Sequence, residues 1–140
     1  MIVRKSPKII NRTITTLSPW AKLIQRDVLF SPDTEPATYH SVLTADYVQV
    51  IARRPDGRIP LVRQYRPAVE RQTLEIPAGL VDPDEHPRTT AQRELLEETG
   101  LPTRAIHDLG SFATDTGRLS NRTNSFFVEA GDQVSNFVGE

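Results

Sequence analysis

The segment from residue 79 to residue 101, GLVDPDEHPRTTAQRELLEETGL, constrains the fold more than any other part of the chain. Pro87 suits the first turn of an α-helix, where its missing N–H group would have no intrahelical partner in any case. No glycine or proline interrupts the residues that follow, up to Thr99. Gly100 and Pro102 together are typical of a helix end. The sequence therefore predicts a helix over residues 87–99.

Three glutamates of this helix, Glu94, Glu97 and Glu98, are spaced i, i+3, i+4, so their side chains lie on one helix face. Like charges at these spacings destabilise an isolated helix by about 0.2–0.5 kcal/mol per pair, which favours a cation in front of them. Hard oxygen ligands suit Mg²⁺ or Mn²⁺, and Mg²⁺ held by a few carboxylates usually also contacts substrate phosphates. Taken alone, such a charge run is more often a solvated helix face.

Composition limits the class of protein. A chain of 140 residues with 37% hydrophobic and 25% charged residues is an ordinary globular domain with a sizeable core. A net charge of −1 gives no electrostatic reason to expect nucleic acid or an anionic membrane as partner. The chain has no cysteine, no signal peptide pattern and no run of about 20 apolar residues, so we expect a cytoplasmic protein without disulfides.

The rest of the chain reads mainly as strands and turns. Residues 20–30 and 38–43 are expected to form one hairpin, and residues 47–52 and 59–63 a second, around the turn RRPDG. Residues 1–18 show no clear period. Further strands are expected at 73–78, 106–113, 124–130 and 136–138. Many strands with one clear helix predict the α+β class.

The glycines and charged residues around the helix have a fixed spacing: Gly79, Glu85, Arg93-Glu94-Leu95, Glu97-Glu98 and Gly100-Leu101. This pattern resembles the Nudix hydrolase box at every defined position. The resemblance implies the Nudix fold, an α/β/α sandwich with a mixed sheet and the box as a loop-helix-loop. It also implies a second helix at the C-terminus, which we expect to be absent from this chain. We expect a β-hairpin extension over 1–43, serving as a dimerisation arm, and a Nudix domain over 44–140 that is incomplete at its C-terminus.

The flanks of the box, VRQYRP at 62–67 and LEIPAG at 74–79, resemble the ADP-ribose pyrophosphatase group of nucleoside-diphosphate-sugar hydrolases. The resemblance implies a metal site and a catalytic centre at Glu94, Glu97 and Glu98, with the backbone carbonyl of Ala78 as a further metal ligand. Clustered Mg²⁺, or Mn²⁺, neutralises the diphosphate and activates the attacking water. Four residues are structural in this comparison: Gly79, Glu85, Arg93 and Gly100.

Substrate-binding residues follow from the same resemblance. Arg66 is expected to contact the diphosphate, since guanidinium–phosphate pairs can be bidentate; the alternative is a surface arginine. Trp20 and Tyr39 are expected to sandwich the adenine across a homodimer interface. The alternative for Trp20 is a core anchor at a strand start. Glu75 is expected to contact the ribose or the loop before the box.

The expected function is Mg²⁺-dependent hydrolysis of a nucleoside-diphosphate sugar, with ADP-ribose preferred, to a nucleoside monophosphate and a sugar phosphate. Two alternatives remain: a Nudix hydrolase of another nucleotide, and a non-catalytic module that binds a nucleotide sugar. Thr116 stands where ADP-ribose-specific members typically carry proline. The catalytic base of such relatives often follows the position of Glu140, so we expect a low activity unless Glu97 supplies it.

Overall fold

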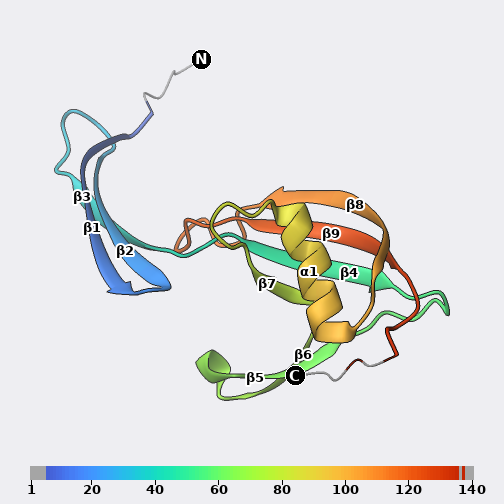
Figure 1. The fold of residues 1–140 in the computed structure, drawn as a ribbon. Helices are drawn as coiled ribbons and strands as arrows, with labels where there is room; N and C mark the ends of the chain where they lie inside the picture. The colour runs from blue at the N-terminus through green and yellow to red at the C-terminus, as the bar shows by residue number, and fades with distance from the viewer. Residues whose placement is uncertain (1–5, 136, 138–140) are drawn as a thin grey trace. The chain divides into compact units, whose positions relative to one another are not determined.

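The computed structural model describes residues 6–135 and 137. The chain divides into two compact units, one made of Met1–Ala45 and Ala113–Asn121 and the other of Asp46–Phe112 and Arg122–Glu140. Figure 1 shows the elements in chain order. In the described part of the chain, no helix is long and apolar enough to cross a membrane.

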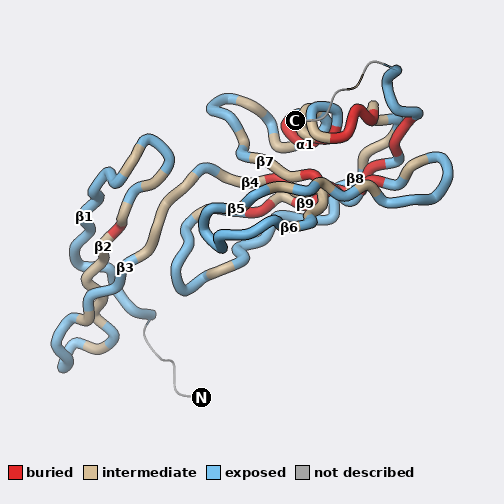
Figure 2. The backbone as a smooth tube through the Cα atoms, turned by 90° about the horizontal axis from the view of Figure 1, so that it is seen from below, coloured by how far each residue is buried: buried red, intermediate tan, exposed pale blue. Residues whose placement is uncertain are grey.

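The first unit is a three-stranded antiparallel sheet of β1 (Lys8–Ser18), β2 (Ala21–Leu29) and β3 (Ala37–Leu43), in that order. The predicted pairing of residues 20–30 with 38–43 is confirmed, but the hairpin is extended by β1, which the sequence analysis did not predict. β1 is rich in isoleucine and threonine, which favour strands. Almost all of it is exposed, so no buried face imposes the apolar alternation by which a strand is recognised (Figure 2).

The second unit contains a mixed four-stranded sheet in the order β7-β4-β9-β8. β4 and β9 are parallel, and the other two pairings are antiparallel. The strands are β4 (Tyr47–Arg53), β7 (Ala78–Leu80), β8 (Thr103–Phe112) and β9 (Thr123–Ala130). This arrangement confirms the predicted α+β class with a mixed sheet.

The helix α1 (Pro87–Thr99) is confirmed at the predicted bounds. His86 is its N-cap, and its imidazole Nδ1 accepts a hydrogen bond from the Arg88 N–H. Gly100 ends the helix with a left-handed φ of 68°, a conformation that favours glycine. Among the described residues α1 is the one α-helix, so the second helical layer of an α/β/α sandwich has no counterpart there.

The core lies between α1 and the central strands of the mixed sheet. Leu95 and Ala91 of the helix are fully buried, and Figure 2 shows buried backbone in α1, β4 and β9. The core cluster also contains residues from the sheet and from the end of the helix: Val48, Val50, Ala52, Leu101, Phe126, Val128 and Ala130. Buried side chains in β4 alternate with intermediate or exposed ones, so one face of this strand packs against the helix.

The predicted second hairpin is wrong. β4 pairs with β7 and β9, not with residues 59–63, because a strand with three fully buried side chains is most stable at the centre of the sheet. Instead, β5 (Val62–Arg66) pairs with β6 (Arg71–Glu75) around a short 3₁₀ helix, η1 (Pro67–Val69). The expected strand at 73–78 is therefore split between two sheets. The expected strand at 136–138 falls on residues of which only Phe137 is described, and Phe137 lies outside any strand.

Candidate functional site

Glu98 is the most firmly held carboxylate of the helix. Its Oε2 accepts a hydrogen bond from the backbone N–H of Ala78 at 3.0 Å. Its Oε1 accepts one from the side-chain amide of Gln64 at 2.7 Å. Partial burial raises the pKa of Glu98, and the Ala78 hydrogen bond opposes this shift. The carboxylate is thus fixed against β7, at the start of the box.

Glu94 lies one turn earlier on the helix and faces Gly79. A Cβ atom added at Gly79 would overlap the Glu94 carboxylate, so glycine is required for this close approach. Burial also raises the pKa of Glu94, although the Arg93 guanidinium lies 2.8 Å from its Oε1. Two half-buried carboxylates on neighbouring turns therefore face the same short strand.

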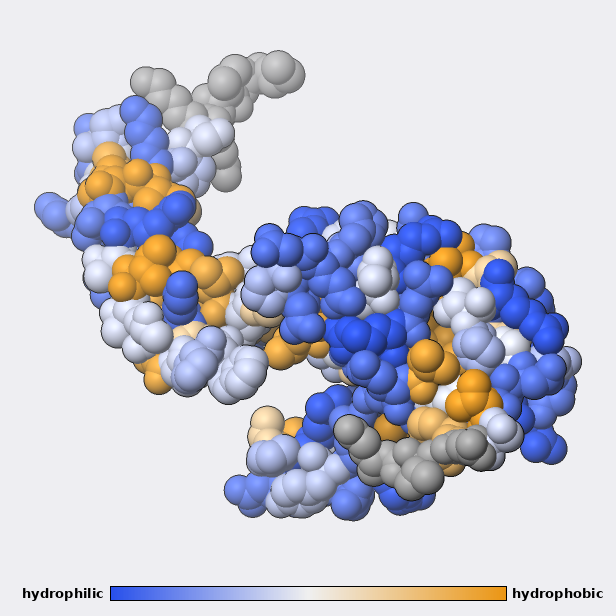
Figure 3. All heavy atoms as spheres, in the orientation of Figure 1, coloured by the Kyte–Doolittle hydropathy of each residue, from blue (hydrophilic) through white to orange (hydrophobic). Residues whose placement is uncertain are grey.

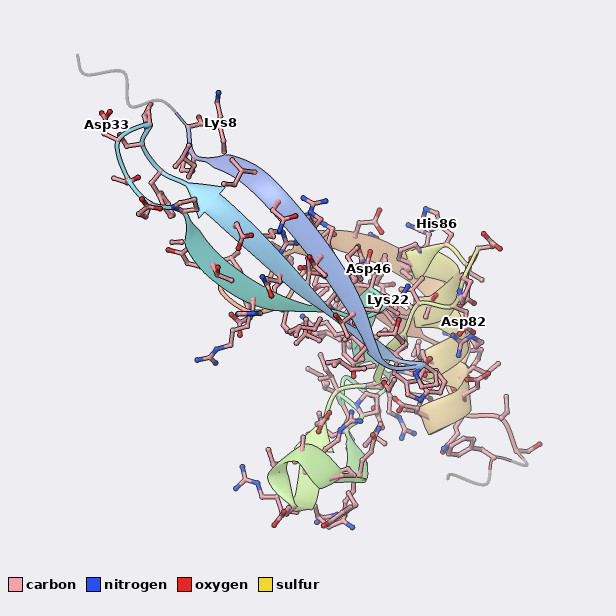
Figure 4. The ribbon with its side chains drawn as sticks, turned by 90° about the vertical axis from the view of Figure 1, so that its left-hand side faces the viewer. Lys8, Lys22, Asp33, Asp46, Asp82 and His86 are labelled. Carbon is pink, nitrogen blue, oxygen red and sulfur yellow. The ribbon has the colours of Figure 1, made fainter. Side chains whose placement is uncertain are left out.

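Arg93 binds the carboxylates of the box together. Its guanidinium lies 2.9 Å from Glu85, 2.8 Å from Glu94 and 3.1 Å from Glu97. The Arg93 and Thr90 hydrogen bonds lower the pKa of Glu85. Figure 4 shows Asp82 on the loop that runs beside the helix, and its carboxylate is 3.6 Å from Arg93. The loop before the helix is thereby tied to the helix.

Glu97 differs from its neighbours in exposure. Its side chain is 57% exposed, whereas those of Glu94 and Glu98 are half-buried, and Arg93 is its ion-pair partner. Of the three helix glutamates, Glu97 is therefore the most accessible to solvent and to a ligand. Beside these residues lies a cavity of about 320 Å³, lined by Val62, Arg63, Gln64, Tyr65 and Glu98.

The Arg66 side chain reaches along the β5–β6 hairpin to Glu75, which pairs with Val62 at the other end of the ladder. The Arg66 Nη2 lies 2.7 Å from Glu75 Oε2, and its Nε lies 3.0 Å from Oε1, so the pair is bidentate. The Arg66 hydrogen bonds, followed by that of Thr73, lower the pKa of Glu75 to about 2. The two residues expected to bind substrate are therefore in contact with each other.

The expected aromatic residues both lie in the first unit. Trp20 is 74% exposed, so the alternative of a core anchor is not what the structure shows. Tyr39 is also exposed, and its ring contacts Phe30 edge-on with the centroids 5.9 Å apart. The structure thus leaves both rings accessible.

The helix carboxylates are the candidate ligands for a divalent metal ion. In the part of the chain that the structure describes, no group of three or more histidine, cysteine, aspartate or glutamate side chains lies close enough together to hold a metal ion. The available oxygens are carboxylates, which Mg²⁺ prefers. Two of these carboxylates are half-buried with raised pKa values, and a nearby cation would favour their charged form. Glu94 and Glu98, with Glu97, are the residues that would hold the ion.

Two contacts of the site were not predicted from the sequence. Gln64 reaches Glu98 from β5, although 34 residues separate them. Thr90 donates to Glu85 and fixes the loop from inside the helix. Gln64 lies in the VRQYRP flank, so the motif already marked this segment as part of the site. That the Gln64 side chain contacts the helix follows only from the β5–β6 pairing.

Fold and site together define an α+β protein in which a loop and a helix carry a cluster of carboxylates beside a mixed sheet. A family model described as the NUDIX domain matches residues 43–136. The chain belongs to the Nudix hydrolase family.

Relatives with curated names extend this comparison. The chain is 39% identical over 116 residues to the methanol dehydrogenase activator of Bacillus methanolicus, covering 83% of this chain and 63% of that protein. It is 38% identical over 82 residues to the ADP-ribose pyrophosphatase of Bacillus subtilis, covering 59% of this chain and 44% of that protein. It is 40% identical over 79 residues to the ADP-ribose pyrophosphatase of Mycobacterium tuberculosis, covering 56% of this chain and 38% of that protein. The chain therefore spans 38% to 63% of the lengths of these relatives.

A solved structure shares the fold. The crystal structure of an ADP compounds hydrolase matches with a TM-score of 0.79 and 23% identity, covering all of this chain and 75% of that one. At this identity the match supports the Nudix fold.

Proposed function

We propose that this chain acts in the hydrolysis of the diphosphate bond of a nucleoside-diphosphate sugar, with ADP-ribose as the preferred substrate. Water adds to one phosphorus, the P–O–P bridge breaks, and the products are a nucleoside monophosphate and a sugar phosphate. The main support is the pair of half-buried carboxylates, Glu94 and Glu98, set against Ala78 and Gly79. The names of the two pyrophosphatase relatives support ADP-ribose.

Each part of the site has a task in this proposal. A bound Mg²⁺ or Mn²⁺ would neutralise the diphosphate and activate the water. Glu94 and Glu98 would hold the ion, with the Ala78 carbonyl as a further ligand. Arg93 ties the loop to the helix through its ion pairs with Glu85 and Glu94. Arg66 binds the diphosphate, with Glu75 orienting its guanidinium. Glu97, being exposed, is the candidate within this chain for accepting a proton.

The role of Arg66 can be tested by Arg66→Lys. A lysine cannot form the planar, bidentate contact that a guanidinium makes with phosphate, so we expect kcat/KM for ADP-ribose with Mg²⁺ to fall by about tenfold or more. Product analysis should show AMP and ribose phosphate for the unchanged protein. Arg71→Lys, which changes an exposed arginine paired opposite on the same hairpin, should keep its activity.

Two outcomes would contradict this proposal. If Arg66→Lys leaves kcat/KM unchanged, Arg66 does not bind the diphosphate. If the unchanged protein binds Mg²⁺ but forms no AMP from ADP-ribose or related nucleotide sugars, the non-catalytic binding alternative is favoured.

A second candidate function comes from the relative that matches over 83% of this chain, which is named as an activator of methanol dehydrogenase. In this alternative the chain acts on another enzyme. Hydrolysis of free ADP-ribose in the absence of any other protein would favour the first proposal.

We also propose that the first unit packs against a second copy of the chain in a homodimer. Its sheet exposes Ile9, Ile10, Ile14, Leu17 and Trp20, and Figure 3 shows apolar side chains gathered on this unit. A small sheet with exposed apolar side chains is more stable when they are covered. In the dimer, Trp20 and Tyr39 would be available to stack on the adenine of the partner's substrate.

The double variant Ile14→Thr with Trp20→Ser should therefore be monomeric by light scattering at concentrations where the unchanged chain is a dimer. Ile59→Thr, at an exposed apolar side chain of the other unit, is the matched control and should remain dimeric. A double variant that stays dimeric would place the interface elsewhere.

A further inference from the structure

A second cavity lies at the far end of β4 from the carboxylates. It measures about 330 Å³ and is lined by Arg53, Arg54, Pro55, Gly57, Arg104, Glu129 and Ala130, here called the arginine cavity. Three arginines and one glutamate make its lining positive. Nothing in the proposed hydrolysis uses these residues.

The arginine cavity is separate from the site on α1. Ala78 and Gly79 pair with Gln49 and Val48 near the start of β4, whereas Arg53 is its last residue. Arg53 lies four positions after Gln49, a rise of about 13 Å along the strand. Figure 1 shows the turn after β4 beyond the end of this strand, away from β7. The two cavities have no lining residue in common.

Each of the three arginines has a carboxylate within ion-pair distance. Arg53 lies 3.0 Å from Glu129, and Arg104 lies 3.2 Å from Asp132. The Arg53 guanidinium also lies over the Phe127 ring, 5.7 Å from its centroid. Exposed pairs of this kind contribute little, and each uses only part of a guanidinium with five N–H donors. Most of their donors thus remain available to a ligand.

Arg54 is the third arginine of the cavity. Its Nε is buried and has no hydrogen-bond partner among the described residues. An oxygen of Asp56 lies 3.8 Å from this Nε, within ion-pair distance but too far for a hydrogen bond. The Arg54 side chain as a whole is 37% exposed, so a ligand in the cavity can reach the exposed part of its guanidinium.

The turn that carries Arg54 is fixed by its own backbone. The Arg54 N–H donates to the Arg58 carbonyl at 2.9 Å, and the Gly57 N–H donates to the Arg54 carbonyl at 2.9 Å. Gly57 has a φ of 82°, which favours glycine, and a Cβ added there would meet no atom within 4 Å. The backbone of the turn that carries Arg54 is therefore fixed, and the space beside Gly57 is open.

We propose that the arginine cavity binds a phosphate monoester. A tetrahedral dianion offers several acceptor oxygens and can engage more than one guanidinium at once. The volume is sufficient for a phosphate group with part of the molecule attached to it. Inorganic phosphate and AMP share this chemistry, and they serve as separate probes.

The test is titration calorimetry of the whole chain with inorganic phosphate and with AMP, in EDTA so that no metal contributes. We expect both probes to bind, AMP more tightly if the attached nucleoside also contacts the cavity. Arg54→Gln should weaken binding at least tenfold, and Arg104→Gln should weaken it as a second, independent variant. Thermal unfolding checks that each variant is folded.

Two controls separate this proposal from the proposed function. Arg58→Gln changes an arginine of the same turn that is 82% exposed and does not line the cavity, so its affinity should stay within twofold. Glu98→Gln should also leave phosphate binding in EDTA unchanged. The proposal is overturned if neither probe binds at millimolar concentration, or if folded Arg54→Gln and Arg104→Gln bind as well as the unchanged chain.

Discussion

Glu98→Gln should lower the affinity for Mg²⁺ at least tenfold and the rate of ADP-ribose hydrolysis at least about 100-fold. The substitution removes a charged metal ligand. Even substitutions of residues that hydrogen-bond to a metal ligand commonly lower metal affinity or activity 10–100-fold. The geometry adds a second cost. Both partners of Glu98, the Ala78 N–H and the Gln64 amide, are donors, so the new –NH₂ group must face one of them. Calorimetry with Mg²⁺ and a product assay measure the two effects.

The matched control is Glu129→Gln, which changes a carboxylate that pairs only with the exposed Arg53 in the described structure. Its Mg²⁺ affinity and hydrolysis should match those of the unchanged protein. If folded Glu98→Gln kept the full Mg²⁺ affinity, the assignment of the metal to α1 would be wrong. If it lost metal but not activity, the hydrolysis would not depend on this metal.

Leu95→Ala should lower the free energy of unfolding of the second unit by about 2–5 kcal/mol. Leu95 is fully buried between α1 and the sheet, and it follows Glu94 directly in the helix. Removing most of its side chain leaves a cavity beside Val48, Val50 and Val128, which belong to the same core cluster. Urea unfolding followed at 222 nm reports on α1.

Leu96→Ala is the control. It removes the same atoms from the neighbouring leucine, whose side chain is 43% exposed. We expect Leu96→Ala to lower the free energy of unfolding by less than about 0.5 kcal/mol, as for most surface substitutions. If both variants lowered the free energy of unfolding by the same amount, the helix would not pack against the sheet through the face that carries Leu95. The metal affinity of Leu95→Ala should also fall, since the glutamates depend on the position of the helix.

Local features of the fold could be predicted from the sequence. Pro87, Gly100 and an uninterrupted stretch between them gave the helix bounds, because helix starts and stops depend on nearby residues. Most strands were found for a similar reason. Their partners were not, since the parallel pairing of Tyr47–Arg53 with Thr123–Ala130 joins segments more than 70 residues apart. β1 was missed because neither of its faces is buried.

The site divides in the same way. The shared face of Glu94, Glu97 and Glu98 follows from helix periodicity, whereas the contacts that hold each carboxylate are long-range. Gln64 reaches Glu98 only because Val62–Arg66 pairs with Arg71–Glu75 and not with β4. The same pairing brings Arg66 against Glu75. From the sequence, Arg66 was expected to contact the diphosphate, and Glu75 the ribose or the loop before the box.

The sequence by itself determined the helix, the face on which its glutamates lie and, through the spacing of the box, the Nudix family. Periodicity and caps act over a few residues, so the order of amino acids is sufficient for them. Only the tertiary structure decided which glutamates are buried, which backbone and side-chain donors hold them, and that Arg53, Arg54 and Arg104 line one cavity. Those properties depend on burial and on pairing between distant strands, and they exist only once the sheet has formed.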